Sequence, residues 1–332
     1  CLMTQMMVAI EMGRVCNGFG LSALASVDLF GANVSWRGTQ EQKEKYLPGI
    51  ASGKKIGCWG LTEPDVGSNA VAIKTRSHLE GDHYILHGTK TFITNAPIAD
   101  YFIVITRECD SQSKKPITAP DGNLFYGGTA FILEKEMEGV TVGEPFKKCG
   151  HRSSPTGEIF LDNVRVPRSH VLGKPHYAFK DMKHSLDVER VIFFGLGLGL
   201  MEYCLETVIR YGSQRKQFGV PIIEHQMIQD KIAMMGSKLE VMRVFAYDTI
   251  KKMNNKEDFS KQAAIAKLLG SKMANEIASE AVQCLGGCGY IEEYGVERCF
   301  RDAKLFDVGG GTTEIQKLIV AKQFIKEVLS HD

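Results

Sequence analysis

The stretch at residues 83–95, HYILHGTKTFITN, indicates most clearly how part of this chain folds. It is rich in aromatic and β-branched residues, it alternates in short runs, and Gly88 divides it into two of them, which is typical of β-strands. Similar runs, broken by Gly, Asn, Asp and Pro, continue from Cys58 to about Val171, among them YFIVITR, TAFILEK and EIFLDNVRVP. We therefore expect a β domain in the middle of the chain, at residues 58–175.

Helical patterns flank this β domain on both sides. Before it, MVAIEMGRV spaces apolar residues at three and four, and TQEQKEKYLPGIASG begins at a possible N-cap, Thr39, and stops at a Pro and a Gly. After it, two long segments (residues 228–252 and 260–287) carry apolar residues on one face. Helices, then strands, then helices indicate an α+β fold. We expect helical domains at residues 1–57 and 176–332.

Size and composition exclude several classes of protein. The 332 residues suffice for two or three domains, and 44% hydrophobic with 24% charged residues is an ordinary soluble composition. A formal net charge of +1 argues against a broad nucleic-acid surface. The longest apolar run, residues 191–201, is shorter than the about 18 residues of a membrane span. Because the chain opens with Cys1 inside a helical pattern, we expect further residues before it.

Cysteine usage predicts free thiols and no metal site. The chain has nine cysteines, an odd number, and they are scattered, which favours a reducing compartment. Cys284 and Cys288 are four residues apart, but no second pair matches them. Buried thiols are therefore the better interpretation.

The glycine-rich run GLGLGL at residues 195–200 does not predict a dinucleotide site. Its spacing is G-x-G-x-G, no strand precedes it, and it lies inside a helical stretch. Small residues at this spacing instead let a neighbouring helix or a ligand approach closely.

Six further motifs occur in an order that resembles one enzyme family. They are TEPDVGSN, GTKTFITN, DVERV, RKQFGVPIIEHQMIQ, QCLGGCGY and GGGTTEIQ. In this order and spacing the chain resembles the acyl-CoA dehydrogenases over nearly its whole length, without the first N-terminal helices of that family. The resemblance implies FAD, a middle β-barrel or sheet domain, a C-terminal four-helix bundle, and a homotetramer built as a dimer of dimers.

The reaction implied is the α,β-dehydrogenation of an acyl-CoA thioester to the 2-enoyl-CoA. In this family a base removes the α-proton while the β-hydride passes to flavin N5. The resemblance also implies the cofactor contacts. Those at the flavin ring and phosphates would be Trp59, Leu61, Thr62, Gly67, Ser68, Phe92, Ile93 and Thr94, with Phe92 where the family often has Trp. Those at the adenine end, partly across a dimer interface, would be Arg215, Gln217, Phe218, Gln283, Gly287, Thr312 and Glu314, the last replacing a common Gln.

The catalytic base is the main question, because the family usually carries its glutamate where this chain has Gly310. A second branch, which includes the isovaleryl-CoA and long-chain enzymes, places it in the motif Asp-x-Glu-Arg, matched here at residues 187–190. We therefore predict that Glu189 is the base, with a raised pKa in an apolar pocket. The alternative is an acid that only stabilises its helix dipole. The backbone N–H of Gly310 would bind the thioester carbonyl, with a ribityl hydroxyl of FAD.

Substrate contacts follow from the same resemblance. Arg190 would meet CoA, Asp187 the pantetheine chain, and Ser68 and Ser154 the substrate. Phe193 falls where the family often has a smaller aliphatic residue. If Phe193 faces the pocket, the acyl group is short, branched or ring-bearing; if it does not, Phe193 and Phe194 form a core pair.

Several alternatives remain open. Gly20 stands where glutaryl-CoA dehydrogenase has an arginine, which disfavours glutaryl-CoA. Asp28 is most simply a helix-surface or hydrogen-bonded residue, but at the distal pocket it is a second candidate acid–base group or a substrate contact. The polar segment at residues 108–125 reads as an exposed loop that could cover the CoA entrance or an interface.

Three classes of function remain in competition. The first is a dehydrogenase that passes electrons to an electron-transfer flavoprotein. The second is an acyl-CoA oxidase that uses oxygen, and the third is an inactive relative that only binds acyl-CoA. We expect the protein in a bacterial cytoplasm or a mitochondrial matrix.

Overall fold

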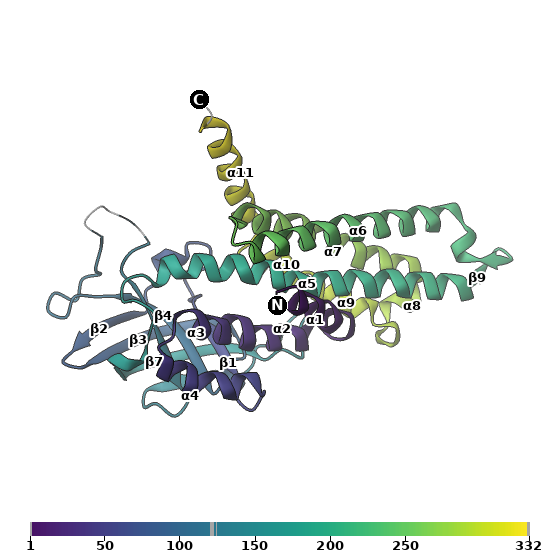
Figure 1. The fold of residues 1–332 in the computed structure, drawn as a ribbon. Coiled ribbons are helices and arrows are strands. Elements are labelled where there is room, and N and C mark those ends of the chain that lie inside the picture. The colour runs from purple at the N-terminus through teal and green to yellow at the C-terminus, as the bar shows by residue number, and fades with distance from the viewer. Residues whose placement is uncertain (1, 120–122, 124, 331–332) are drawn as a thin grey trace. The chain divides into compact units, whose positions relative to one another are not determined.

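The computed structural model describes residues 2–119, 123 and 125–330 (Figure 1). The chain divides into two compact units. The sheet unit comprises Ser22–Lys147 and Ser153–Leu186, and the helical unit comprises Cys1–Leu21, Lys148–Arg152 and Asp187–Asp332. Helices α2 and α5 contribute residues to both units, so the units do not follow the three expected domains. The boundaries expected at residues 57 and 175 stay a prediction.

The chain is helical at both ends and β-rich in the middle, which confirms the expected α+β class. The helices, in chain order, are α1 (Leu2–Val15), α2 (Asn17–Leu24), the π-helix η1 (Ala25–Gly31), α3 (Ala32–Arg37), α4 (Gln40–Ala51), α5 (Ala178–Gln214), α6 (Gln226–Asn254), α7 (Ser260–Leu285), α8 (Gly287–Tyr290), α9 (Val296–Ala303), α10 (Leu305–Val308) and α11 (Thr313–Leu329). Short 3-10 helices are η2 (Ala70–Ala72), η3 (Ala96–Ile98), η4 (Arg168–His170), η5 (Ile222–Glu224) and η6 (Glu292–Tyr294).

The strands form one large sheet and one small hairpin. They are β1 (Gly57–Gly60), β2 (Arg76–Glu80), β3 (His83–Thr94), β4 (Tyr101–Glu108), β5 (Gly128–Glu134), β6 (Val140–Val142), β7 (Thr156–Pro167), β8 (Val171–Leu172), β9 (Lys216–Gln217) and β10 (Val220–Pro221). The eight-stranded sheet has the order β6-β7-β3-β2-β4-β5-β8, with β1 parallel to β4, and β9 pairs with β10.

The sequence at residues 83–95 forms almost entirely a single strand, β3, and not two. Its pairing with β7 shifts register between Leu86 and Gly88 and again between Lys90 and Ile93. The second shift carries Phe92 in a left-handed backbone (φ 57°) and leaves its ring 67% exposed, whereas Ile93 is buried. A β-bulge re-aims a side chain in this way, which is common next to binding sites.

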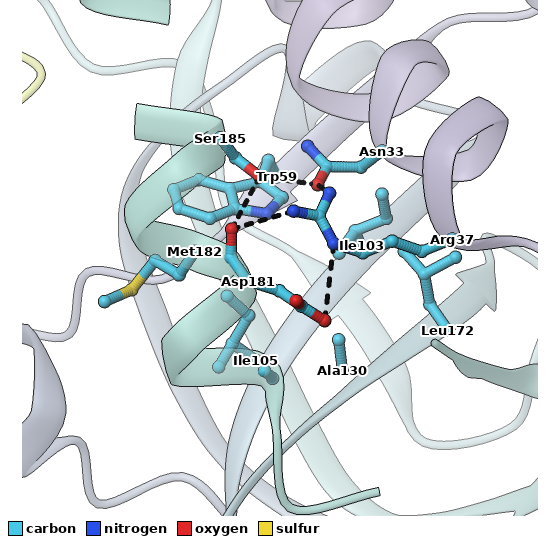
Figure 2. Close-up of a pocket in the computed structure, with 11 residues that line it drawn as sticks. Asn33, Arg37, Trp59, Ile103, Ile105, Ala130, Leu172, Asp181, Met182 and Ser185 are labelled. Carbon is cyan, nitrogen blue, oxygen red and sulfur yellow. Dashed lines mark hydrogen bonds and ion pairs between the residues drawn. The ribbon is translucent and has the colours of Figure 1, made fainter. Parts of the chain in front are cut away.

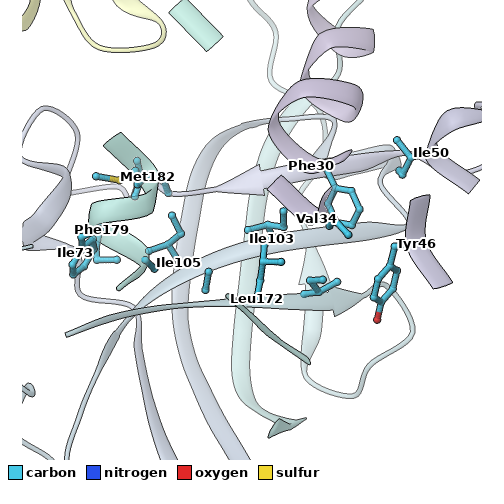
Figure 3. Packing of buried hydrophobic residues seen from close by; sticks show 14 of the residues in the cluster. Phe30, Val34, Tyr46, Ile50, Ile73, Ile103, Ile105, Leu172, Phe179 and Met182 are labelled. Carbon is cyan, nitrogen blue, oxygen red and sulfur yellow. The ribbon is translucent and has the colours of Figure 1, made fainter. Parts of the chain in front are cut away.

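Strand β4 separates two hydrophobic cores because its side chains alternate. Phe102 and Val104 belong to one core, with Tyr84, Leu86 and Phe131. Ile103 and Ile105 point the other way, into the cluster of Figure 3 with Phe30, Tyr46, Leu172, Phe179 and Met182. Burial on both faces explains why β4 reads as a nearly continuous apolar run.

Helix α4 begins at the expected N-cap. The Thr39 hydroxyl accepts from the Gln42 N–H and the Gln42 side chain accepts from the Thr39 N–H, a capping box. The expected stop at the Pro was wrong, because Pro48 lies inside the helix, which ends at Ala51 before Gly53. A Pro this close to a helix end removes one hydrogen bond and the chain tolerates it.

The helical unit is held together by small residues as well as by large ones. The glycines of GLGLGL lie in α5 and allow α1 to pack closely, as expected: a Cβ on Gly195 would lie 2.8 Å from the Ala9 Cβ, and one on Gly199 would lie 2.0 Å from the Ile10 carbonyl oxygen. Arg14 of α1 also forms ion pairs with Glu202 and Glu206 of α5. This run therefore serves helix packing.

Gly199→Ala is expected to destabilise the protein by about 3 kcal/mol, because the new methyl group would collide with α1 backbone that cannot move by itself. The measurement is the free energy of unfolding in urea. Gly236→Ala is the matched control: its Cβ would meet only Leu205 Cδ2, at 3.9 Å, so it is expected to stabilise α6 by about 0.5–1 kcal/mol. Equal effects of both variants would contradict close packing at Gly199.

Helix α5 is long and apolar enough, by length and composition alone, to cross a membrane. Its most apolar 18-residue window has a mean hydropathy of 1.6, but 67% of that window is buried inside the protein. A helix whose apolar surface is already covered by protein is best explained as a core helix.

Candidate active site

Glu189 lies in α5 beside the glycine loop at residues 309–311. A Cβ placed on Gly310 would lie 3.9 Å from each of the two Glu189 carboxylate oxygens. Gly310 and Gly311 have φ angles of 63° and 93°, a left-handed backbone that glycine adopts without strain. The loop therefore leaves space next to the carboxylate, and no side chain of its own fills that space.

The surroundings of Glu189 change its acidity. Burial raises the pKa of Glu189 to about 7, although the positive charges of Arg190 and Lys267 partly oppose this rise. The side chain keeps some exposed surface, but the atoms packed around it are dense enough to desolvate the carboxylate. A carboxylate with a pKa near neutral can accept a proton at physiological pH and release it again.

Arg190 and Asp187 hold the loop that faces Glu189. Arg190 Nε donates to the Gly310 carbonyl oxygen at 3.1 Å, and Arg190 Nη1 donates to Asp187 Oδ1 at 2.7 Å. Ser260 Oγ donates to the other Asp187 oxygen at 2.6 Å. Arg190 and Asp187 are buried and engaged inside the protein. The CoA and pantetheine contacts expected for them stay predictions.

The start of α11 closes this part of the site. Thr312 is its N-cap, and the hydroxyl accepts from the Ile315 N–H at 3.4 Å, while Glu314 is exposed in the first turn. Gln316 is fully buried and its Nε2 donates to the Gly311 carbonyl oxygen at 3.1 Å. Gln316 and Arg190 thus fix the carbonyl groups of two successive loop glycines.

The two adjacent phenylalanines of α5 point in different directions. The ring of Phe193 lies 5.0 Å from the ring of Phe306 in α10. The ring of Phe194 fills the space that a side chain on Gly270 of α7 would occupy. Both are buried, so Phe194 is a core residue, and Phe193 is the one whose ring packs beside the segment leading to the glycine loop.

The first group of expected cofactor contacts lies in the sheet unit, where β1 ends beside β3. Thr62 accepts from the Thr91 N–H at 2.9 Å, which places it next to the bulge that carries Phe92. Thr62 and Thr94 are half-buried, whereas Leu61 and Ile93 are buried. Ser154 is buried, and its hydroxyl lies 3.0 Å from that of Ser22.

A small pocket lies against Trp59 (Figure 2). Its polar side is a closed network: Arg37 donates to Asn33 Oδ1 at 2.6 Å and to the Asp181 carbonyl oxygen at 2.9 Å, and Ser185 donates to Asn33 at 2.7 Å. These groups bind one another and line the same pocket as Trp59.

The turn after Thr62 is open. Gly67 and Ser68 are exposed, and a Cβ on Gly67 would meet no atom within 4 Å. Backbone N–H groups and one hydroxyl are therefore accessible here to an anionic or polar ligand.

Most of the second group of expected cofactor contacts lies at the far end of the helical unit from α10 and α11, whereas Thr312 and Glu314 of that group lie at the start of α11 (Figure 1). Arg215, Gln217 and Phe218 belong to the β9–β10 hairpin and its approach, and all three are exposed, Phe218 by 94%. Gln283 and Gly287, at the end of α7 and the start of α8, are exposed as well. Within one chain, these residues lie away from Glu189, Arg190 and the glycine loop.

The remaining expectations concern metals, thiols, Asp28 and the loop. Within residues 2–119, 123 and 125–330, no group of three or more His, Cys, Asp or Glu side chains could hold a metal ion. The eight cysteines in the same ranges are free. Asp28 is buried in the π-helix η1 of the sheet unit. Part of the polar segment at residues 108–125, namely residues 120–122 and 124, lies outside the described residues.

Sequence reasoning missed Lys267, whose side chain is buried in α7 next to Glu189. A signal for it was available: Lys267 lies four residues after Ala263 and four before Ser271, on the small, apolar face of α7. A lysine on the buried face of a helix needs a partner inside the protein.

The comparisons with known proteins point to one family. Models of the N-terminal, middle and C-terminal domains of acyl-CoA dehydrogenases match residues 2–54, 58–164 and 179–325. A probable acyl-CoA dehydrogenase of Bacillus subtilis is 39% identical over 95% of this chain and 80% of its own length. A mitochondrial isovaleryl-CoA dehydrogenase of Solanum tuberosum is 35% identical over 96% of this chain and 74% of its own.

One further relative and one solved structure extend this similarity. A subunit of a caffeyl-CoA reductase–Etf complex of Acetobacterium woodii is 35% identical over 96% of this chain and 81% of its own length. The structure of butyryl-CoA dehydrogenase from Megasphaera elsdenii superimposes with a TM-score of 0.89 at 35% identity, covering 96% of this chain and 80% of that one.

Proposed function

Because the chain belongs to the acyl-CoA dehydrogenase family, whose members are flavoprotein oxidoreductases, we propose that it dehydrogenates an acyl-CoA thioester between Cα and Cβ, with Glu189 as the base. The observation that carries this proposal is the Glu189 carboxylate beside the glycine loop, with its pKa raised to about 7.

Glu189 removes the α-proton in this proposal. The α-proton of a thioester is weakly acidic, so the negative charge that develops on the carbonyl oxygen needs a fixed donor. The Gly310 N–H supplies that donor without a side chain that would occupy the acyl space. Arg190 binds the carbonyl of the same residue, which belongs to the next peptide unit, and so restrains the loop beside this N–H.

The exposed residues of the sheet unit fit a flat cofactor with a polar edge, which supports FAD. Phe92 is largely exposed on a bulged strand, with its ring 5.6 Å from that of Phe146. Thr62, after β1, and Thr94, at the end of β3, are half-buried. The open turn at Gly67 and Ser68 offers backbone and hydroxyl donors. When bound, FAD supplies the two-electron acceptor for the β-hydride. The proposed adenine-end contacts remain the exposed Arg215, Gln217, Phe218, Gln283, Gly287 and Glu314, with the half-buried Thr312.

The proposed partners are an acyl-CoA, an electron-transfer flavoprotein and further copies of this chain. One relative is named as a subunit of an Etf complex, which supports the second partner. Exposed large apolar side chains support the third: they include Phe218, Met227, Val241, Val244 and Tyr290, and, on α11, Leu318, Phe324, Ile325 and Val328. A homotetramer in a bacterial cytoplasm or a mitochondrial matrix is consistent with the bacterial and mitochondrial relatives.

The proposed acyl group is short, branched or ring-bearing, because Phe193 adds a bulky ring beside Phe306. The relative named as a caffeyl-CoA reductase supports a second candidate, in which the same proton and hydride positions are used in the reducing direction on an aryl-substituted enoyl-CoA.

The test is a steady-state assay of the FAD-loaded protein with butyryl-, isovaleryl-, 3-phenylpropionyl- and palmitoyl-CoA and an artificial electron acceptor. Activity with one of the first three and none with palmitoyl-CoA is expected. Hydrogen peroxide formed under air without an acceptor would identify an oxidase instead. A purified protein that holds FAD but turns over none of these thioesters in either direction would contradict the proposal.

A further inference from the structure

Lys267 is a buried charged side chain beside Glu189 that the mechanism above does not use. It lies on α7 and is 1% exposed, and its Nζ donates to the carbonyl oxygen of Phe306 in α10. Ser271, one turn further along α7, donates to the same carbonyl oxygen at 2.6 Å. Lys267 and Ser271 of α7 thus both hold Phe306, which lies three positions before the glycine loop.

Lys267 also lies next to the candidate base. The Cβ position on Gly310 is 3.8 Å from Lys267 Cε and 3.9 Å from the Glu189 carboxylate oxygens, so both side chains border the same space. The charged groups that act on Glu189 are Arg190 of α5 and Lys267 of α7. Those that act on Lys267 are Glu189, Arg190 and Asp307 of α10.

We propose that Lys267 is a positioning residue for this reaction: its buried ammonium group fixes the approach to the glycine loop and stabilises the charged form of Glu189. This inference rests on the proposed role of Glu189 as the base. Lys267, on α7, would thereby help to set the pH at which the base works.

The two halves of this role have distinct physical causes. The Phe306 carbonyl would be satisfied by Ser271 even without Lys267, so anchoring alone does not require a charge. A buried ammonium group is costly unless an anion lies near it. Burial lowers the pKa of Lys267 to about 8, and the carboxylates of Glu189 and Asp307 keep it from falling further. Lys267 therefore remains mostly protonated near pH 7, where Glu189 titrates.

The first experiment is the pH dependence of kcat/KM for wild type and three variants. Lys267→Gln removes the charge but keeps an N–H donor, Ser271→Ala removes the other donor to Phe306 without changing charge, and Lys272→Gln changes an exposed lysine of the same helix. Lys267→Gln is expected to move the acidic limb upward by about one pH unit, because an opposite charge this close favours the carboxylate. The two controls are expected to leave the limb in place.

Two results would overturn the proposal in this experiment. One is an acidic limb that stays within about 0.3 unit in Lys267→Gln, since an opposite charge nearby normally shifts a pKa by more than this. The other is an equal shift in Ser271→Ala: that variant changes no charge, so the shift in Lys267→Gln would not come from the ammonium group of Lys267.

A second measurement does not depend on activity, so it separates a failure of this inference from a failure of the proposed function. The ¹³Cε resonance of Lys267 is titrated by NMR in the wild type and in Glu189→Gln, and Lys267→Arg assigns the signal. Because the carboxylate that raises the pKa of Lys267 is absent in Glu189→Gln, its midpoint is expected at lower pH than in the wild type. The same midpoint in both proteins would overturn the inference whether or not Glu189 is the base.

Discussion

Glu189→Gln is expected to lower kcat by about a thousandfold while the protein stays folded, since loss of a positioned general base costs about 10²–10⁴ in rate. Gln keeps the size of Glu and cannot accept the α-proton. The measurement is kcat with the best thioester of the panel above. Binding of that thioester is expected to survive, because the Gly310 N–H and the glycine loop are unchanged.

The pH dependence gives a second readout of the same variant. Wild-type kcat/KM is expected to rise with pH through about 7, where Glu189 loses its proton, and this limb is expected to disappear in Glu189→Gln. The contribution of Glu189 to folding stability changes with pH in the opposite direction to activity. A carboxyl group whose pKa rises on folding from 4.5 to about 7 binds its proton more tightly in the folded state, so its contribution to stability falls over that interval. As the pH rises from about 4.5 to about 7, Glu189→Gln is therefore expected to gain stability relative to the wild type.

Moving the base provides the control for this prediction. In a Glu189→Gln, Gly310→Glu double variant, the Cβ of the new side chain would lie 3.9 Å from the positions of the old carboxylate oxygens, so its carboxylate can reach the same space. The left-handed backbone at residue 310 opposes a side chain there, so recovery is expected to be partial, about tenfold. A Glu189→Gln protein with undiminished kcat would show that another group removes the proton, and Asp28 would then be tested.

Lys90→Met is expected to destabilise the protein by about 3–5 kcal/mol, the cost of breaking a buried ion pair. Lys90 is fully buried, and its Nζ donates to Glu63 Oε1 at 2.8 Å and to the Leu61 carbonyl oxygen at 3.0 Å. Glu63 also accepts from the backbone N–H groups of Lys74 and Thr75. The variant would leave that carboxylate buried without its cation. The measurement is the free energy of unfolding in urea at pH 7.

Both partners of this pair are charged at that pH. Burial lowers the pKa of Lys90 to about 8, against the pull of Glu63. Burial also pushes the pKa of Glu63 upward, but Lys90 and the N–H donors outweigh it, so the net direction is downward. The double variant Lys90→Met, Glu63→Gln is the matched control and is expected to recover part of the loss, because no unpaired charge remains. A single variant as stable as the wild type would contradict a structural role for the pair.

The Lys90–Glu63 pair also concerns the candidate cofactor residues. Leu61 and Glu63 flank Thr62, so the pair fixes the backbone on both sides of that hydroxyl. The sequence shows a Lys in one motif and a Glu in another, 27 residues apart, and neither has a local pattern that pairs them. They come together because β3 lies beside the segment after β1, where the Thr91 N–H donates to the Thr62 carbonyl oxygen.

Periodicity predicted the elements more reliably than it predicted the site. The β-rich texture and the long amphipathic helices come from short-range alternation, which the sequence displays directly. The bulge that exposes Phe92 depends on the register between β3 and β7, and a register between distant strands is not visible locally. Pro48 was expected to end its helix, yet so close to the end it removes only one hydrogen bond.

The family resemblance located Glu189 and Gly310, and the structure places them beside each other. It assigned Arg190 and Asp187 to CoA, whereas their spacing of three on a helix also allows the ion pair that the structure contains. Lys267 was missed because a lysine in a helical pattern is usually interpreted as solvated. Its position on the small-residue face of α7 contradicts that interpretation.

The most direct test of the central claim is anaerobic mixing of the FAD-loaded protein with the best thioester of the panel, followed by flavin absorbance. The wild type is expected to bleach in a single turnover, and Glu189→Gln is expected to bind the thioester but to bleach about a thousandfold more slowly. Bleaching of Glu189→Gln at the wild-type rate would contradict the assignment of Glu189 as the base.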